Sequence, residues 1–106
     1  MTIQYGGKAM YKHVVCFKLA EPTEELCRQT KEILLSMREN VPMARSVSVG
    51  IDTLHSHRSY DIILEVVLDG QEALDAYQND LYHVNVVKKH MHAVSCASVT
   101  VDCFID

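Results

Sequence analysis

Two strand-like segments follow one another in this chain, with only a short polar stretch between them. Within residues 44–53, Val47, Val49 and Ile51 alternate with Ser46, Ser48 and Gly50, and residues 60–69 have an apolar side chain at every second position from Tyr60 to Leu68. This period is typical of a β-strand that buries one face. The stretch LHSHRS, residues 54–59, is polar and predicts a loop. The two strands therefore follow one another with no helix between them, and the helices must be sought before and after the pair.

A strand and a helix are predicted on the N-terminal side of this pair. The run YKHVVCFKL predicts a strand over residues 10–18. Thr23 is a suitable N-cap for the helix that follows, with two glutamates in its first turn. Pro42 should end this helix. Its apolar face comprises Leu26, Thr30, Ile33, Leu34, Met37 and Val41.

A second helix and a final strand complete the chain. Asp69 and Glu72 have the spacing of a capping box, and the helix they open should reach about Gln78. We expect a break at Asn79-Asp80, with Asp80 capping a further helical stretch to about residue 91. A strand over 95–105 follows, and its apolar face is formed by Ala97, Val99, Val101, Cys103 and Ile105.

The order of elements is βαββαβ, which is the ferredoxin-like α+β arrangement with an antiparallel sheet and both helices on one side. A chain of 106 residues is long enough for one such domain. We assign it to residues 10–106. Residues 1–9 contain two adjacent glycines and no periodic pattern, and we interpret them as a tail.

The second face of the predicted sheet has no helix to cover it. The apolar side chains expected there would each contribute roughly 1.5 to 2 kcal/mol when buried, or about 8 to 10 kcal/mol together. That is comparable to the whole stability of a small domain, about 5 to 15 kcal/mol. We therefore expect a homodimer in which two sheets pair face to face. The residues assigned to this face are Val14, Cys16, Ile63, Val67 and Phe104, mixed with Glu65, Thr100 and Asp102.

Charge and hydropathy exclude several classes of partner. The net charge is −4, so neither nucleic acid nor an anionic membrane surface is expected to bind. No apolar stretch approaches the roughly 20 residues that a membrane span needs. The first ten residues lack the pattern of a signal peptide, so the expected compartment is the cytoplasm. The cysteines show no CxxC spacing and are expected to be buried free thiols.

Three parts of the sequence form a recognisable set: YKHVVCFKL near the start, SYDIILEVVLDGQEALDAYQND in the middle, and HVNVVKKHM with VTVDCFI at the end. Together they resemble the stress-responsive dimeric α/β-barrel family, the Dabb domain. The resemblance covers about residues 10–105. It implies a ferredoxin-like protomer that dimerises sheet to sheet into a barrel. Most members of the family have no established activity.

The resemblance also implies a candidate site. A plant polyketide cyclase with a similar domain closes a ring by aldol-type chemistry in a cleft between sheet and helices. Its pocket uses a histidine of the first strand, a tyrosine of the second helix, and a histidine six residues later. The matching positions here are His13, Tyr77 and His83. The histidine-proline that usually precedes the last histidine is Asp80-Leu81 in this chain.

Two interpretations of this trio remain open from the residues themselves. His13 is in phase with Val15 and Phe17, so it should face the helices. In a continuous helix Tyr77 and His83 would lie about 120° apart, and a break near residue 80 would be needed to bring them together. In the first interpretation the trio is an acid/base pocket in which the tyrosine hydroxyl holds an oxyanion. In the second, a buried histidine forms a hydrogen bond to a tyrosine or a backbone carbonyl and fixes the packing of the second helix.

The remaining histidines and carboxylates offer weaker candidates. The pairs His55-x-His57 and His90-x-His92 could bind a metal, but neither has a third ligand at a standard spacing, so we expect no metal and no cofactor. Asp61 and Glu65 would share one face of their strand, either as a carboxylate pair in the barrel or as polar contacts at the dimer interface.

Three functional hypotheses follow. The first is a homodimeric domain that binds a small, partly apolar organic ligand between sheet and helices. The second is a cofactor-free cyclase-like or isomerase-like enzyme that uses His13, Tyr77 and His83. The third is a structural assembly protein without a ligand, in which Met37, Leu74, Val87 and Met91 would fill the interior.

Overall fold

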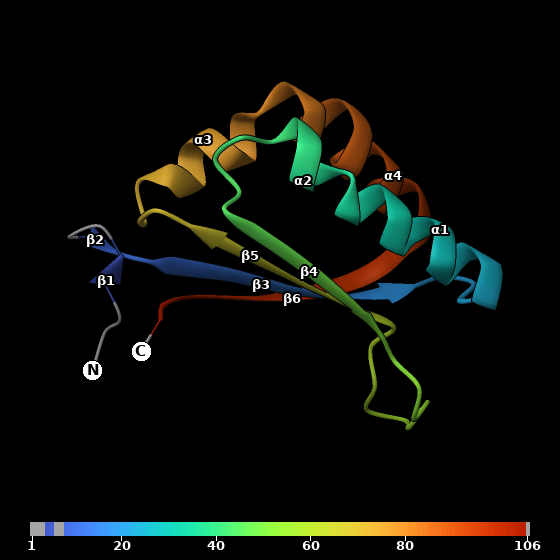
Figure 1. Ribbon diagram of the computed structural model, residues 1–106. Helices are drawn as coiled ribbons and strands as arrows, with labels where there is room; N and C mark the ends of the chain where they lie inside the picture. The colour runs from blue at the N-terminus through green and yellow to red at the C-terminus, as the bar shows by residue number, and fades with distance from the viewer. Residues whose placement is uncertain (1–3, 6–7, 106) are drawn as a thin grey trace.

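The computed structural model describes residues 4–5 and 8–105. A four-stranded antiparallel sheet, in the order β4-β5-β3-β6, carries all the helices on one face (Figure 1). The order of elements along this sheet confirms the predicted ferredoxin-like α+β fold. Its strands are β3 (Tyr11–Leu19), β4 (Ser46–Ile51), β5 (Ile62–Leu68) and β6 (Ser95–Phe104).

The first helical connection begins as predicted. Helix α1 (Glu24–Leu35) is capped by Thr23, whose Oγ1 accepts a hydrogen bond from the Leu26 backbone N–H at 3.1 Å. At Ser36 the helix is interrupted, and the short helix α2 (Met37–Asn40) follows. The apolar face continues across the interruption, because Leu34, Met37 and Val41 are all buried.

The second connection does not begin with the predicted capping box. Helix α3 (Ala73–Asn79) has Glu72 at its N-cap position, and no side chain caps it. The Asp69 carboxylate instead receives two hydrogen bonds from the Arg45 guanidinium, at 2.8 and 2.7 Å. This bidentate pair joins Asp69 to the residue before β4, and not to the N-terminus of α3. The expected capping role of Asp69 is therefore wrong.

The predicted break near residue 80 is present. Asp80 has extended backbone, and its Oδ1 accepts a hydrogen bond from the His83 backbone N–H at 3.0 Å. A new helical segment starts there. It contains the π-helix η1 (His83–Lys88) and continues as α4 (Lys89–Val94). Asp80 thus ends α3 and caps the next segment.

The core lies between the sheet and the helices. Strand β5 is at its centre, since four of its alternating side chains are at most 2% exposed: Ile62, Leu64, Val66 and Leu68. The helices contribute Leu34 and Met37 from one side and Tyr77 and Val87 from the other. This layer positions α3 and η1 over β3.

The face assignment of β6 differs from the prediction. Directly opposed residues share a face of a sheet, and Asp102 is opposite His13 while Thr100 is opposite Val15. Asp102, Thr100 and Phe104 therefore lie on the helix side, not on the open face. Phe104 packs edge-on against the ring of Tyr11. The prediction failed because it assumed that the more apolar side of β6 faces the helices.

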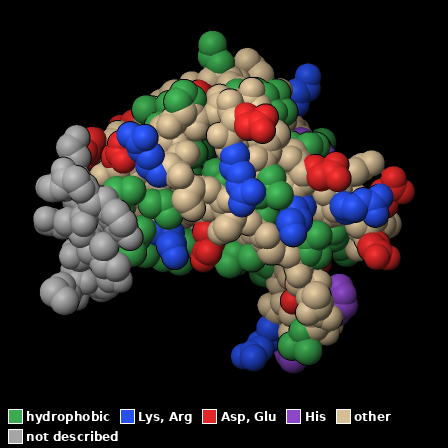
Figure 2. Space-filling view, viewed as in Figure 1, with side chains coloured by type: hydrophobic (Ala, Val, Ile, Leu, Met, Phe, Trp, Pro, Cys, Tyr) green, Lys and Arg blue, Asp and Glu red, His purple; other side chains and the backbone are tan. Residues whose placement is uncertain are grey.

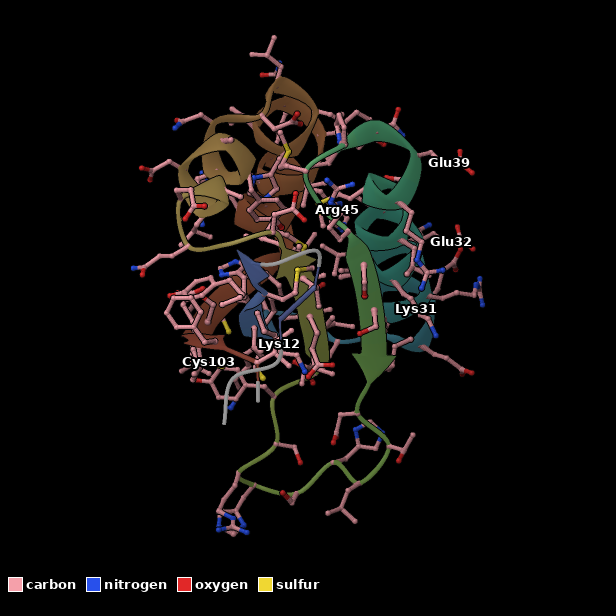
Figure 3. The ribbon with its side chains drawn as sticks, turned by 60° about the vertical axis from the view of Figure 1, so that its left-hand side comes forward. Lys12, Lys31, Glu32, Glu39, Arg45 and Cys103 are labelled. Atoms are coloured by element: carbon pink, nitrogen blue, oxygen red, sulfur yellow. The ribbon has the colours of Figure 1, made fainter. Side chains whose placement is uncertain are left out.

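The open face is more apolar than predicted as a result. Val99 and Val101 of β6 lie on it and are 51% and 62% exposed, beside the 40% exposed Ile63 of β5. Lys12 and Cys103 lie on adjacent strands of this face (Figure 3). Part of the polar content remains, since Glu65 lies 4.0 Å from the Lys12 ammonium.

Several smaller expectations have mixed outcomes. Residues Gln4–Tyr5 (β1) and Lys8–Ala9 (β2) pair with each other within the predicted tail, whose other residues lie outside the described part. All four cysteines are free thiols, but Cys96 and Cys103 are exposed, so their predicted burial is wrong. Across the described residues, no helix is both long enough and apolar enough to span a membrane.

Candidate functional site

A pocket of about 400 Å³ lies between the sheet and the second set of helices. Its floor comes from β3 and β6, and its other walls come from α3, η1 and α4. The lining is mixed. Apolar side chains include Val15, Phe17, Leu64 and Met91, and polar ones include Gln78, Lys88, Ser98 and Thr100. Ser98 and Thr100 of β6 line the pocket, which explains why the helix side of that strand is not apolar there.

His13 lies at the floor of this pocket and has a carboxylate partner. Its side chain is only 6% exposed, and its Nδ1 lies 2.5 Å from Oδ1 of Asp102 on the neighbouring strand. An ionised carboxylate can only accept, so the imidazole donates through Nδ1 and leaves the lone pair on Nε2. The register between β3 and β6 creates this pair, because it places the two residues directly opposite each other.

Tyr77 is buried beneath the pocket wall, and its hydroxyl has another partner. The side chain is fully buried, and the hydroxyl donates a hydrogen bond to Sδ of Met37 at 3.6 Å. Burial, with a smaller contribution from Asp80, raises the pKa of Tyr77 far above its usual value, so the phenol is neutral. The ring lies edge-on to His13, with centroids 5.5 Å apart. The predicted oxyanion role requires the hydroxyl to turn away from Met37, and it stays a prediction.

His83 stacks on Tyr77 and completes the trio. The two ring centroids are 4.3 Å apart, with 29° between the ring planes. His83 is 6% exposed, and its Nδ1 makes no hydrogen bond of good geometry. Burial is the main cause that lowers the pKa of His83 to about 4, and the Lys88 ammonium adds to the effect. The ring is therefore neutral at pH 7.

The structure brings together the three residues that the sequence singled out. The ring of Tyr77 contacts the rings of both His13 and His83. The break at Asp80 allows the contact between Tyr77 and His83, which a continuous helix would place on different faces. Sequence reasoning missed Asp102, because it was assigned to the opposite face of the sheet. The available signal was the polar alternation of Ser98, Thr100 and Asp102, which marks one side of β6 as the wall of a cavity.

The two H-x-H pairs lie apart from one another and have different surroundings. His55 and His57 are exposed on the loop that projects from the sheet on the side away from the helices, and Figure 2 shows histidine side chains at its tip. The Asp52 carboxylate accepts a hydrogen bond from the His55 backbone. His90 bonds to the buried Thr30 hydroxyl at 2.9 Å, while His92 lines the pocket. Within residues 4–5 and 8–105, no group of three or more histidine, cysteine or acidic side chains is arranged to hold a metal ion.

Asp61 and Glu65 serve separate purposes and do not pair with each other. Asp61 precedes β5, and its Oδ2 accepts a hydrogen bond from the Leu19 backbone N–H at 2.8 Å, at the irregular end of β3. Glu65 lies on the open face between Lys12 and Ser48. Neither carboxylate is among the residues that line the pocket.

Solved structures of similar fold come from several organisms. A dimeric protein of unknown function and ferredoxin-like fold from Bacteroides fragilis is 24% identical, with a TM-score of 0.77 over 91% of this chain and 96% of its own. A dimeric ferredoxin-like protein of unknown function from Thermobifida fusca is 19% identical, with a TM-score of 0.81 over 99% of both chains. A hydroxynitrile lyase from Passiflora edulis is 10% identical, with a TM-score of 0.75 over 93% of this chain and 95% of its own.

At sequence identities of 24% or less, similarity to these solved structures shows the fold alone. A comparison with curated proteins gave no significant match. The family is shown by the sequence itself, because residues 11–105 match the stress responsive A/B barrel domain, Dabb, across nearly the whole chain. The fold agrees with that match. The chain therefore belongs to the Dabb family of stress-responsive α/β-barrel domains.

Proposed function

We propose that the protein binds a small, partly apolar organic ligand in the pocket between the sheet and the α3–α4 helices. The observation that carries this proposal is the pocket itself, which remains open beside two of the side chains that were expected to fill it. Val87 and Met91 form part of its wall, and about 400 Å³ remains beside His13. This volume lies in the range of small-molecule sites, about 300 to 1,000 Å³. A purely structural role with a filled interior is correspondingly disfavoured.

A second candidate, cofactor-free acid/base catalysis, is favoured by the Asp102–His13 pair. The carboxylate holds the imidazole in one tautomer and stabilises the imidazolium that forms when Nε2 accepts a proton. A carbon acid bound in the pocket would transfer its α-proton to Nε2, and the electron pair of the C–H bond would form an enolate. The hydroxynitrile lyase from Passiflora edulis indicates that a protein of similar fold can be an enzyme.

We also propose that the functional unit is a homodimer formed through the open face of the sheet. Its exposed valines and Ile63 would otherwise remain in water, and solved proteins of the same fold are described as dimeric. The cytoplasm is the compartment we propose, because the free thiols of all four cysteines suit a reducing environment.

Ligand binding is tested by NMR on the whole protein. The ring signals of His13 and His83 should shift when phenolic or β-dicarbonyl compounds are added to the wild type. Ser98→Trp places a large ring in the pocket and should abolish the shifts. Asn85→Trp changes an exposed residue of η1 that does not line the pocket, so the shifts of the His13 and His83 signals should persist in this variant. Shifts that persist in Ser98→Trp would place binding elsewhere.

Catalysis is tested separately by hydrogen–deuterium exchange. Phenylacetone in D2O should lose its benzylic protons faster with the wild type than with His13→Asn, roughly 10²- to 10⁴-fold for a general base. Asp102→Asn should also be slow, while the exposed Asp75→Asn should match the wild type. Binding without exchange would refute the catalytic candidate and leave the ligand site standing.

A further inference from the structure

The pocket lining carries side chains that can donate hydrogen bonds through nitrogen. They include Lys88, and His92 at the last turn of α4. No aspartate or glutamate of the described residues lines the pocket. The carboxylates of Asp102 and Asp80 lie next to lining residues, and they already accept hydrogen bonds from His13 and from the His83 backbone N–H, respectively. Since the whole chain carries a net charge of −4, this local excess of nitrogen donors does not reflect a generally basic surface.

Lys88 is held over the pocket with donor capacity to spare. It is half-buried, and its Nζ donates a hydrogen bond to the backbone carbonyl of Gln78 at 3.2 Å. An ammonium group carries three N–H donors, and this bond uses one of them. Across residues 9–105 no carboxylate forms a salt bridge with Lys88. The bond to Gln78 spans the break at Asp80 and fixes the ammonium near the wall formed by α3.

The π-helix explains why this lysine faces the pocket. In an α-helix, residues 83 and 88 would lie roughly 140° apart, so only one of them could face the sheet. In η1 the hydrogen bonds run from residue i to residue i+5, which returns Lys88 to the side that carries His83. Both residues line the pocket as a result. Short π-helical segments occur frequently at functional sites.

We propose that the pocket selects ligands that carry an anionic oxygen, a carboxylate or phenolate, and that Lys88 is the residue that recognises it. This inference rests on the proposed ligand pocket and adds the class of ligand. The apolar floor of Val15, Phe17 and Leu64 accommodates the carbon skeleton. The half-buried ammonium then forms a charge-assisted hydrogen bond to the anionic oxygen, a stronger bond than one between neutral groups.

The test compares two probes of nearly equal shape, 4-hydroxybenzoate and 4-hydroxybenzamide, by isothermal titration calorimetry. Wild type should bind the carboxylate about ten-fold more tightly than the amide, as expected for a hydrogen bond to a charged group. Lys88→Gln should remove this preference while leaving the affinity for the amide unchanged. Lys89→Gln is the matched control, because Lys89 is the adjacent, exposed lysine and does not line the pocket.

The outcomes separate this inference from the proposed function. Equal affinities in the wild type, or a preference that survives in Lys88→Gln, would overturn the role of Lys88. If neither 4-hydroxybenzoate nor 4-hydroxybenzamide binds while other compounds shift the His13 signal, the anion preference is refuted and the proposed ligand pocket is retained. If no compound of either panel binds, the proposed ligand site itself fails. The inference is supported if the wild type and Lys89→Gln prefer 4-hydroxybenzoate and Lys88→Gln does not.

Discussion

Mild acid should destabilise this protein through His83. The ring is buried, and the pKa of His83 is lowered from 6.5 to about 4, first by burial and then by Lys88 and His13, against opposing contributions from the Tyr77 backbone and Asp80. In the unfolded chain the imidazole regains its ordinary pKa and binds a proton more readily than in the folded state. The stability associated with neutral His83 is therefore complete above about pH 6.5 and is lost as the pH falls toward 4.

The size of the effect follows from the same two values. The difference between a pKa of 6.5 and one of about 4 corresponds to about 3 kcal/mol once His83 is protonated in both states. At pH 5 the loss relative to neutral pH should be about 2 kcal/mol, because the unfolded state is then almost fully protonated at this residue and the folded state is not. That is a considerable fraction of the stability of a small domain, about 5 to 15 kcal/mol.

His83→Phe isolates this contribution. Phenylalanine keeps the stack on Tyr77, removes the titrating group, and gives up no hydrogen bond at Nδ1. Urea unfolding followed by circular dichroism, at constant protein concentration between pH 7.5 and 4.5, measures the free energy of unfolding for both proteins. Between pH 7 and pH 5 the variant should lose about 2 kcal/mol less than the wild type. Other titrating groups cancel in the difference between the two curves.

The cause of the shift can be tested in the same protein. The NMR midpoint of the His83 ring should lie near pH 4 in the wild type and rise in Lys88→Met, which removes one of the groups that lower the pKa of His83. Lys89→Met changes an exposed lysine and should leave the midpoint in place. Parallel stability curves for wild type and His83→Phe, together with a midpoint near pH 6.5, would refute the reasoning.

Three further predictions concern the dimer, the helix break and the core. Val101→Asp puts a charge on the open face of the sheet and should produce monomers in analytical ultracentrifugation. Leu81 is 76% exposed and lies away from that face, so Leu81→Asp should remain dimeric. Asp80→Ala removes the cap on the His83 N–H and should cost about 1 kcal/mol in urea unfolding, against almost nothing for the exposed Asp75→Ala. Met37→Ala should cost about 2 to 5 kcal/mol, and Met37→Leu less than about 1.5; equal costs would show that packing around this fully buried residue does not matter.

Much of the fold could be predicted because it depends on local patterns. The period of two in residues 62–68 marks β5 and its buried face without any knowledge of neighbours. Thr23 and Asp80 form the predicted caps, since a cap involves a backbone N–H only three residues away. Asp69 had an equally good capping pattern, but its carboxylate pairs with Arg45, which is distant in sequence, and no side chain caps α3.

The sequence by itself determined the order of elements and the break at Asp80, and its resemblance to the Dabb family singled out the three rings. Only the tertiary structure decided what those rings face. The phase of β6 depends on its position at the edge of the sheet, where one side borders a cavity and the other lies on the open face, so apolar alternation alone could not orient it. The same register places Asp102 opposite His13, and the π-helix turns Lys88 toward the pocket. These pairings join residues far apart along the chain or depend on an irregular helical turn, and neither follows from local periodicity.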